Sequence, residues 1–382
     1  MNAPFSSHAE VAATAWDVPA LAAGFSVAGE EPVTAAVGCE LATIFRIASI
    51  TKPITATLAL ELLDLEARTG IWPDDVQIRH LLSHTSGYDC ECGDLARFGD
   101  GDEALARVVA ELPGVRRLVG TEQAWSYANT GYWLAAHLAA VRAGSSYEDA
   151  IAAHVLGPAG LEATSFGEPE LAGTGPAAAT GPYPRARRPS GGLVSNVPDL
   201  LRFGRWQLTQ PRAARLRVPY GRPTAGVYGL GLFGERVCGV EVWGHGGSYG
   251  GFQSSLLVIP EREAVFAGLT NSSIGERALR QLEDVFFERV LGAPRPRPQP
   301  VDLPEAVCAS YAGAYANDAD RYDVRAHHNG LVVCFEGVDY PARPIGTATF
   351  EITEGDAAGE RFDFPLEGFG RFSSRLAERV AC

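Results

Sequence analysis

One serine–lysine pair in this chain combines a nucleophile and a base at a spacing that suits a helix. Lys52 is the only lysine among 32 basic residues, and Ser49 lies three positions before it. Arginine stays protonated in proteins, whereas a buried lysine can lose its proton and act as a base. If Ser49 begins a helix, residues i and i+3 share a face, so the amine of Lys52 can reach the serine oxygen. The pair therefore predicts Ser49 as an activated nucleophile and Lys52 as its base.

A second candidate group is Tyr127, in the segment Trp125–Tyr132 ahead of an apolar run. A tyrosine whose pKa is lowered by a neighbouring cation can act as a general base and then as an acid. Asn129 follows two residues later, and its amide can donate to a substrate carbonyl. The alternative interpretation is a loop that carries a buried structural tyrosine.

A third group is the glycine-rich segment Trp243–Gly251, which lies ahead of a predicted strand. Its glycines, including Gly246 and Gly247, would let a substrate backbone approach closely. His245 could polarise Tyr127 or hold a carboxylate, and we expect activity to fall below about pH 6.5, the usual pKa of histidine. The alternative is a structural histidine.

The elements that must position these groups mix helix and strand. Apolar periodicity predicts helices over Ile50–Arg68, Thr130–Arg142 and Arg277–Val290. A sheet built from N-terminal and C-terminal strands, with helices around it, predicts a layered α+β domain. The expected strands are Phe25–Val27, Val33–Val37, Phe252–Ile259 and Glu263–Leu269.

A proline-rich segment, Gly292–Pro300, divides the chain. Proline alternating with polar residues predicts an extended, rather stiff linker. We expect a first domain at 1–291, a linker at 292–304 and a small β-rich domain at 305–382. Short aromatic and β-branched runs in this tail, with a hairpin signal at Asn329-Gly330, predict a small antiparallel sheet or barrel.

Composition excludes several classes of protein. The net charge of −14 and the pI near 5.1 argue against a nucleic-acid partner and against an anionic membrane surface. We find no apolar run of about eighteen residues, and hence predict no transmembrane helix. The first residues lack the pattern of a secretory signal, which favours a cytoplasmic protein. The seven cysteines are scattered and read as free thiols, and we expect no metal site at Cys90–Cys92.

The order of the three motifs resembles that of the penicillin-recognising serine hydrolases. These include class C β-lactamases, D-Ala-D-Ala carboxypeptidases, D-aminopeptidases and related esterases. The motifs are Ser49–Lys52, Tyr127–Asn129 and His245–Gly247. The blocks Ile78–Gly87 and Pro189–Asp199 are similar to family blocks as well. The resemblance implies a β-lactamase/transpeptidase-like fold, an antiparallel sheet flanked by helices plus an all-helical region.

The resemblance also implies residue roles. Ser49 would attack a carbonyl carbon and form an acyl-enzyme, while Lys52, with Tyr127, would take the serine proton and pass it to the leaving group. The backbone N–H groups of Ser49 and Ser248 would form the oxyanion hole. No metal or organic cofactor is implied. The expected partner is a small amide, peptide or ester.

One departure narrows the expected activity. β-Lactamases of this group usually carry lysine where this chain has His245, so the histidine resembles DD-peptidase, D-aminopeptidase and thioesterase members instead. Asn129, His245, Gly246 and Gly247 would line the acyl pocket. The β-rich tail fits relatives with a lipocalin-like C-terminal domain.

We therefore expect a serine acyl hydrolase or acyl transferase of small amides, peptides or esters. A D-residue-directed peptidase, amidase or peptide-cyclising thioesterase ranks ahead of a carboxylesterase or a weak β-lactamase. A non-catalytic sensor of acyl ligands is the alternative from a different class.

Overall fold

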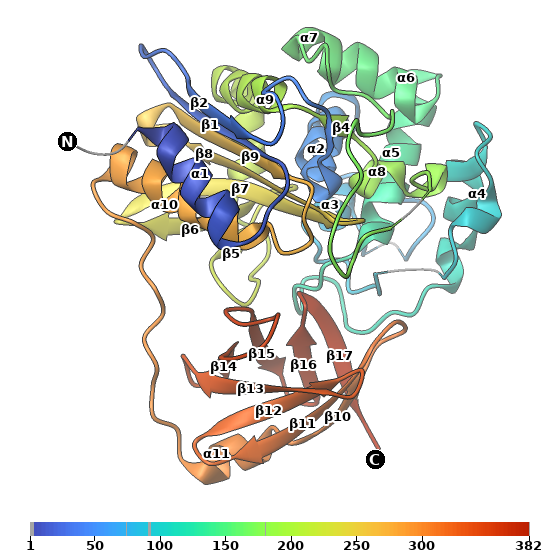
Figure 1. The fold of residues 1–382 in the computed structure, drawn as a ribbon. Coiled ribbons are helices and arrows are strands. Elements are labelled where there is room, and N and C mark those ends of the chain that lie inside the picture. The colour runs from blue at the N-terminus through green and yellow to red at the C-terminus, as the bar shows by residue number, and fades with distance from the viewer. Residues whose placement is uncertain (1–3, 74, 91–92, 180, 382) are drawn as a thin grey trace.

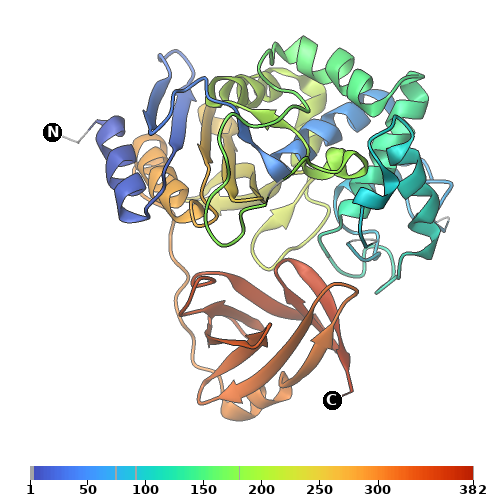
Figure 2. The same cartoon turned by 45° about the vertical axis from the view of Figure 1, so that its right-hand side comes forward.

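The computed structural model describes residues 4–73, 75–90, 93–179 and 181–381, which form a larger body and a smaller barrel (Figure 1). Figure 2, turned by 45°, shows the barrel seated beneath the body and joined to it by an extended segment. The expectation about Cys92 falls outside the described residues.

Within the described residues, the centre of the body is a seven-stranded antiparallel sheet in the order β2-β1-β9-β8-β7-β6-β5. N-terminal and C-terminal strands meet where β1 pairs with β9, as the sequence predicts. The hairpin of the first two strands is confirmed as well. The strands are β1 (Leu21–Val27), β2 (Val33–Val37), β5 (Val227–Tyr228), β6 (Phe233–Val237), β7 (Val240–Tyr249), β8 (Phe252–Ile259) and β9 (Ala264–Thr270).

Helices cover both faces of this sheet. Helices α1 and α10 cover one face, whereas α9 and the helical region around α2 and α5 lie on the other (Figure 1). A two-stranded ribbon, β3 (Phe45–Arg46) with β4 (Val194–Ser195), lies beside the helical region. The helices are α1 (Phe5–Ala15), α2 (Thr51–Leu62), α3 (Ile78–Leu82), α4 (Ala104–Glu111), α5 (Asn129–Ala143), α6 (Tyr147–Ile151), α7 (Gly157–Ala159), α8 (Arg188–Gly191), α9 (Val197–Thr209), α10 (Glu276–Leu291) and α11 (Glu305–Ser310).

Because both faces are covered, alternate residues of a strand enter different cores. In β9, Val265, Ala267 and Leu269 pack with residues of α2 and α9. Ala264 and Phe266 pack with residues of α1 and α10. Of these helices, none within the described residues has the length and apolarity that crossing a bilayer requires.

Two predicted elements differ from the structure. Helix α2 ends at Leu62 rather than Arg68, because the chain beyond it pairs with the segment before α3: Arg68 bridges Gln77. The glycine-rich segment Trp243–Gly251 lies ahead of strand β8, as expected, but most of it also belongs to β7, a strand that the sequence did not predict. Glycine weakens a strand on average, but pairing with β8 along Trp243–Tyr249 fixes this one.

The tail of the described chain is a closed, eight-stranded antiparallel barrel in which β10 pairs with β17. Helix α11 covers one end and inserts Cys308 into the barrel core. The predicted hairpin is confirmed, since β11 and β12 pair from His327 and Gly330 onward. The strands are β10 (Gly313–Ala316), β11 (Arg321–His327), β12 (Gly330–Phe335), β13 (Val338–Pro344), β14 (Thr349–Ile352), β15 (Arg361–Leu366), β16 (Phe369–Phe372) and β17 (Arg375–Val380).

Candidate active site

Ser49 lies in a short 3-10 turn, η1 (Ala48–Ile50), that runs directly into α2. The residue before it, Ala48, has a φ of 42°, in the left-handed region that non-glycine residues seldom adopt. Such a conformation costs about 1 kcal/mol or more and persists only where the surrounding structure holds it. The turn places the Ser49 side chain at the start of a helix and in the wall of a cavity.

Lys52 is fully buried one turn along, on the same side of the helix. Its Nζ lies 3.2 Å from Ser49 Oγ and donates to the carbonyl oxygen of Ser190, on α8, at 2.6 Å. The same nitrogen lies 4.7 Å from the centre of the Tyr127 ring. The structure thus brings together the serine and the lysine that the sequence predicts as a pair.

Tyr127 completes this cluster from the segment that precedes α5. Its phenol donates to Ser49 Oγ at 2.8 Å, so the serine oxygen lies between the phenol and the amine. The expectation that a cation lowers the pKa of Tyr127 is wrong for the free protein. Burial raises the pKa of this phenol far above its usual value, and this outweighs the hydrogen bond with Ser49. Tyr127 is therefore a neutral proton donor at rest.

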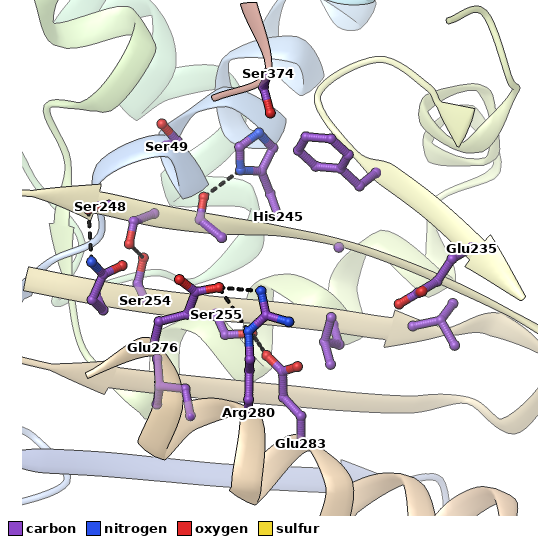
Figure 3. A pocket seen from close by; sticks show the side chains of 18 of the residues that line it. Ser49, Glu235, His245, Ser248, Ser254, Ser255, Glu276, Arg280, Glu283 and Ser374 are labelled. Carbon is purple, nitrogen blue, oxygen red and sulfur yellow. Dashed lines mark hydrogen bonds and ion pairs between the residues drawn. The ribbon is translucent and has the colours of Figure 1, made fainter. Parts of the chain in front are cut away.

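His245 stands on β7, on the side of the sheet that faces Ser49 (Figure 3). Its Nδ1 donates to the carbonyl oxygen of Gly246 at 2.5 Å, and its Nε2 has no hydrogen-bond partner among the described residues. Burial, and then the charge of Lys52, lower the pKa of His245 to about 3. The ring is neutral near pH 7, with Nε2 as an acceptor. This lowered pKa argues against a loss of activity below pH 6.5 through this histidine, and a neutral ring does not hold a carboxylate by charge.

Gly247 is required by the contact between β7 and the serine turn. A Cβ at this position would lie 2.3 Å from the carbonyl oxygen of Ile47 and 3.0 Å from the backbone nitrogen of Ser49. Gly246 is different, since a Cβ there would meet only the carbonyl oxygen of Ser254, at 3.6 Å. These glycines were expected to let a substrate backbone approach the strand. In the structure, Gly247 instead lets the segment that carries Ser49 approach it.

Among the strands of the described residues, none pairs with one edge of the outer half of β7. Strand β6 pairs with β7 only as far as Gly244, whereas β8 pairs with it to Tyr249. Ser248 lies in this half and lines the same cavity as Ser49. Asn129 follows Tyr127 by two positions in the sequence. It is the first residue of α5, is buried, and is not among the described residues that line the cavity.

The cavity has a volume of about 530 Å³ and a second, charged end. Figure 3 shows Ser49 and His245 on one side of β7 and β8, and Arg280 and Glu283 of α10 on the other. Glu283 is 7% exposed and accepts a hydrogen bond from Ser255 at 2.6 Å. Its other oxygen lies 3.2 Å from Arg295, and burial raises the pKa of its carboxyl.

The barrel contributes to the site, which the sequence did not predict. Ser373 and Ser374, in the turn between β16 and β17, line the cavity. The carbonyl oxygen of Ser374 accepts from the backbone N–H of Tyr127 at 2.9 Å. Leu376 donates its backbone N–H to the hydroxyl of Ser126 at 3.1 Å. The segment that carries Tyr127 is therefore held in part by the last strands of the barrel.

A buried ion pair fixes this contact. Arg371 of β16 pairs with Asp363 of β15, with Arg371 Nε 2.8 Å from Asp363 Oδ1. The same guanidinium donates to the carbonyl oxygens of Trp125, at 3.0 Å, and Arg222, at 2.9 Å. A Phe-Ser-Ser-Arg turn between two short strands is typical of the end of a hairpin, but gives no indication of where that end docks. No cluster of three or more His, Cys, Asp or Glu able to hold a metal ion occurs in the described part of the chain.

Comparison with known proteins places these features in a family. The β-lactamase family model matches residues 9–286. Penicillin-binding protein 4 of Amycolatopsis lactamdurans is 28% identical over an alignment that covers 72% of this chain and 85% of that protein.

Two solved structures are similar over long stretches. SurE, crystallised with D-Leu, matches with a TM-score of 0.79 and 23% identity, over 98% of each chain. The D-amino acid amidase of Ochrobactrum anthropi SV3, complexed with L-phenylalanine amide, matches with a TM-score of 0.64 and 21% identity, over 75% of this chain and 98% of that one. At these identities the likeness establishes the fold.

Proposed function

This chain belongs to the β-lactamase family and is a serine hydrolase, and from that premise we propose that it cleaves amides or peptides at a D-residue through an acyl-enzyme on Ser49. The observation that carries the proposal is the position of Ser49 Oγ, 2.8 Å from the Tyr127 phenol and 3.2 Å from Lys52 Nζ. The D-residue part is supported by the two similar proteins, one crystallised with D-Leu and the other named for D-amino acid amides.

Acylation begins with Ser49 Oγ attacking the substrate carbonyl carbon. The new bond is O–C, and the bond that breaks joins the carbonyl carbon to the leaving nitrogen. Because burial raises the pKa of Tyr127, a phenolate is an unfavourable base in the free protein. Lys52 therefore accepts the serine proton in molecules in which its amine has first released its own proton. Tyr127 donates its own proton to the departing nitrogen, and Lys52 restores it.

Deacylation reverses these roles. A water molecule loses its proton to the same pair of groups and attacks the acyl carbon, and Ser49 recovers its proton as the O–C bond breaks. An amine in place of water would give acyl transfer. The backbone N–H groups of Ser49 and Ser248 would stabilise the oxyanion, and each such donor is typically worth about 3–4 kcal/mol.

The neutral His245 ring defines what the pocket accepts. Its Nδ1 is occupied by the Gly246 carbonyl, so only Nε2 is available, and only as an acceptor. An N–H or O–H group of the substrate can donate a hydrogen bond to Nε2. A carboxylate cannot bind there, because Nε2 carries no proton to donate. We propose that His245 accepts from a substrate amide or amine near the reacting carbonyl.

A substrate panel with intact-mass analysis tests the proposal. The protein is incubated with D- and L-amino acid p-nitroanilides, D-Ala-D-Ala peptides, p-nitrophenyl esters and nitrocefin. We expect faster cleavage of the D-amino acid anilides than of their L-isomers, and a transient acyl adduct on Ser49.

Ser49→Ala should abolish every activity, and Ser6→Ala, at an exposed serine of α1, should change none. Activity that survives Ser49→Ala would refute the mechanism. Equal rates for D- and L-isomers would remove the D-residue part. A permanent adduct without turnover would favour an acyl-ligand sensor.

A further inference from the structure

The barrel contains a cavity of its own, of about 230 Å³. One end of the barrel is closed, because Tyr311 beside α11 stacks on Phe364 with ring centres 4.3 Å apart. Toward the other end the inward side chains leave space between the strands. The cavity is lined mainly by apolar and aromatic side chains, among them Tyr322, Val333, Phe335, Tyr340, Phe362 and Phe372.

The end of the barrel that holds this cavity faces the body. In the turn between β10 and β11, Asp318 donates its N–H to the Asp89 carboxylate at 3.0 Å. In the loop between β14 and β15, the Asp356 carbonyl oxygen accepts from Arg277 at 3.1 Å. The turn between β16 and β17 bonds to the body as described above. Three connections at this end therefore contact the body.

One residue connects the cavity to the candidate active site. Ser373 lines both the barrel cavity and the larger cavity that contains Ser49. Its side chain bonds with the phenol of Tyr322, which stands inside the barrel. On the other flank, Glu360 at the rim of the barrel cavity lies within electrostatic range of Arg280 on α10, in the lining of the larger cavity. The two cavities thus share Ser373, in the two-residue turn between β16 and β17.

The lining specifies the ligand chemistry. Tyr322 lies between Phe372 and Phe335, with ring centres 4.5 and 5.0 Å away, so the wall is a row of aromatic faces. An apolar cavity of about 150 Å³ is enough to bind benzene in another protein. Three charged residues also line the cavity, Asp356, Glu360 and Arg361. Arg361 lies 3.7 Å from the carboxylate of Glu351, so the two acidic groups leave a net negative rim that disfavours a ligand ending in an anion.

We propose that the barrel cavity is a second binding site, which takes an apolar, phenyl-sized group at the far end of a substrate whose reacting carbonyl lies at Ser49. The inference rests on the proposed function and deepens it: the substrate class becomes an amide or peptide with an uncharged aromatic or branched aliphatic end, long enough to pass the Ser373–Ser374 turn. The barrel then selects substrates as well as supporting Tyr127.

The experiment fills the cavity and leaves the active site unchanged. Val333 is 4% exposed and lines the cavity, whereas Val338, on the same barrel, is 51% exposed and does not line it. Val333→Phe and Val338→Phe therefore form a matched pair. Each full-length variant is assayed with D-alanine p-nitroanilide and with the longer Phe-Gly-Gly-D-Ala p-nitroanilide, and titrated with the neutral apolar dye N-phenyl-1-naphthylamine.

We expect Val333→Phe to lower kcat/KM for the long anilide by roughly tenfold or more, mainly through KM, since burial of a phenyl group is lost. The short anilide should be cleaved as by the wild type, and Val338→Phe should alter neither substrate. Dye fluorescence should disappear only in Val333→Phe.

The proposal is overturned if Val333→Phe binds the dye as the wild type does, or if both anilides lose activity equally. The dye titration requires no turnover and is repeated with Ser49→Ala, so a protein that cleaves none of the anilides still decides whether the cavity binds an apolar group. Failure of this site and failure of the proposed hydrolase are therefore separate results.

Discussion

The buried, neutral state of His245 should make the protein lose stability in acid. An unfolded histidine titrates near pH 6.5, whereas in the fold burial and Lys52 lower the pKa of His245 to about 3. Between these values the unfolded chain binds a proton that the folded one excludes, so the contribution is complete above pH 6.5 and falls as the pH drops toward 3. From pH 6.5 to pH 5, an interval of about 1.5 units at about 1.4 kcal/mol per unit, the loss is about 2 kcal/mol.

The perturbation is His245→Asn, which keeps a neutral donor for the Gly246 carbonyl and removes the titration. Urea unfolding of the wild type and the variant at pH 7 and pH 5 gives, for each protein, the decrease in the free energy of unfolding between the two pH values, called here its acid loss. We expect the wild-type loss to exceed that of the variant by about 2 kcal/mol. His84 is also buried, with a pKa lowered first by burial, then by Lys52 and then by His245. Because burial is present in both chains, the larger part of the His84 contribution cancels in the comparison.

His327→Asn, at an exposed position on β11, is the matched control and should show the wild-type loss. Equal acid losses in the wild type and in His245→Asn would refute the buried, neutral histidine. A ¹³C-labelled histidine spectrum checks the same point directly, since the His245 signal should keep its neutral shift down to pH 5.

Two further substitutions test the packing around the site. Gly247→Ala should lower kcat by about a hundredfold, because the added Cβ collides with the Ile47 carbonyl and displaces the turn that carries Ser49. Gly246→Ala, whose Cβ would make only an ordinary contact with the Ser254 carbonyl oxygen, should retain most activity in the same assay. Arg371→Met should destabilise the protein in urea by about 3–5 kcal/mol, since it leaves Asp363 buried without its partner. The double variant with Asp363→Leu should lose less than the single one, and an equal or larger loss would contradict the buried-pair argument.

Local sequence was sufficient to predict the family and to predict that Ser49 and Lys52 lie close together. The family predicted from the order of the three motifs is confirmed, and Ser49 and Lys52 lie together because both stand on one helical turn. Tyr127 reaches the same point from another segment, as the resemblance implied. Long amphipathic elements such as α10 and paired β-branched runs such as β8 and β9 were predicted within one or two residues.

Local sequence does not predict the ionisation states of Tyr127 and His245. The pKa shifts of Tyr127 and His245 come chiefly from burial, and burial depends on how elements distant in the sequence pack around a side chain. The presence of Lys52 suggested a lowered pKa for Tyr127, but desolvation outweighs the neighbouring groups. The contact of Ser374 with Tyr127 spans 247 positions of the numbering, and no pattern in either segment predicts it.

The bond between Tyr127 and Ser374 also fixes when the site can be completed during synthesis. The ribosome produces Ser49, Lys52 and His245 long before Ser374, and domains generally fold in the order in which they are made. A nascent chain can thus assemble the sheet, η1 and α2 while the Tyr127 backbone still lacks the partner that holds it at 2.9 Å. A chain released before β16 and β17 would carry Ser49 and the amine of Lys52 with a loosely held Tyr127 phenol. Under the proposed function, activity would therefore require translation through at least the last described strand.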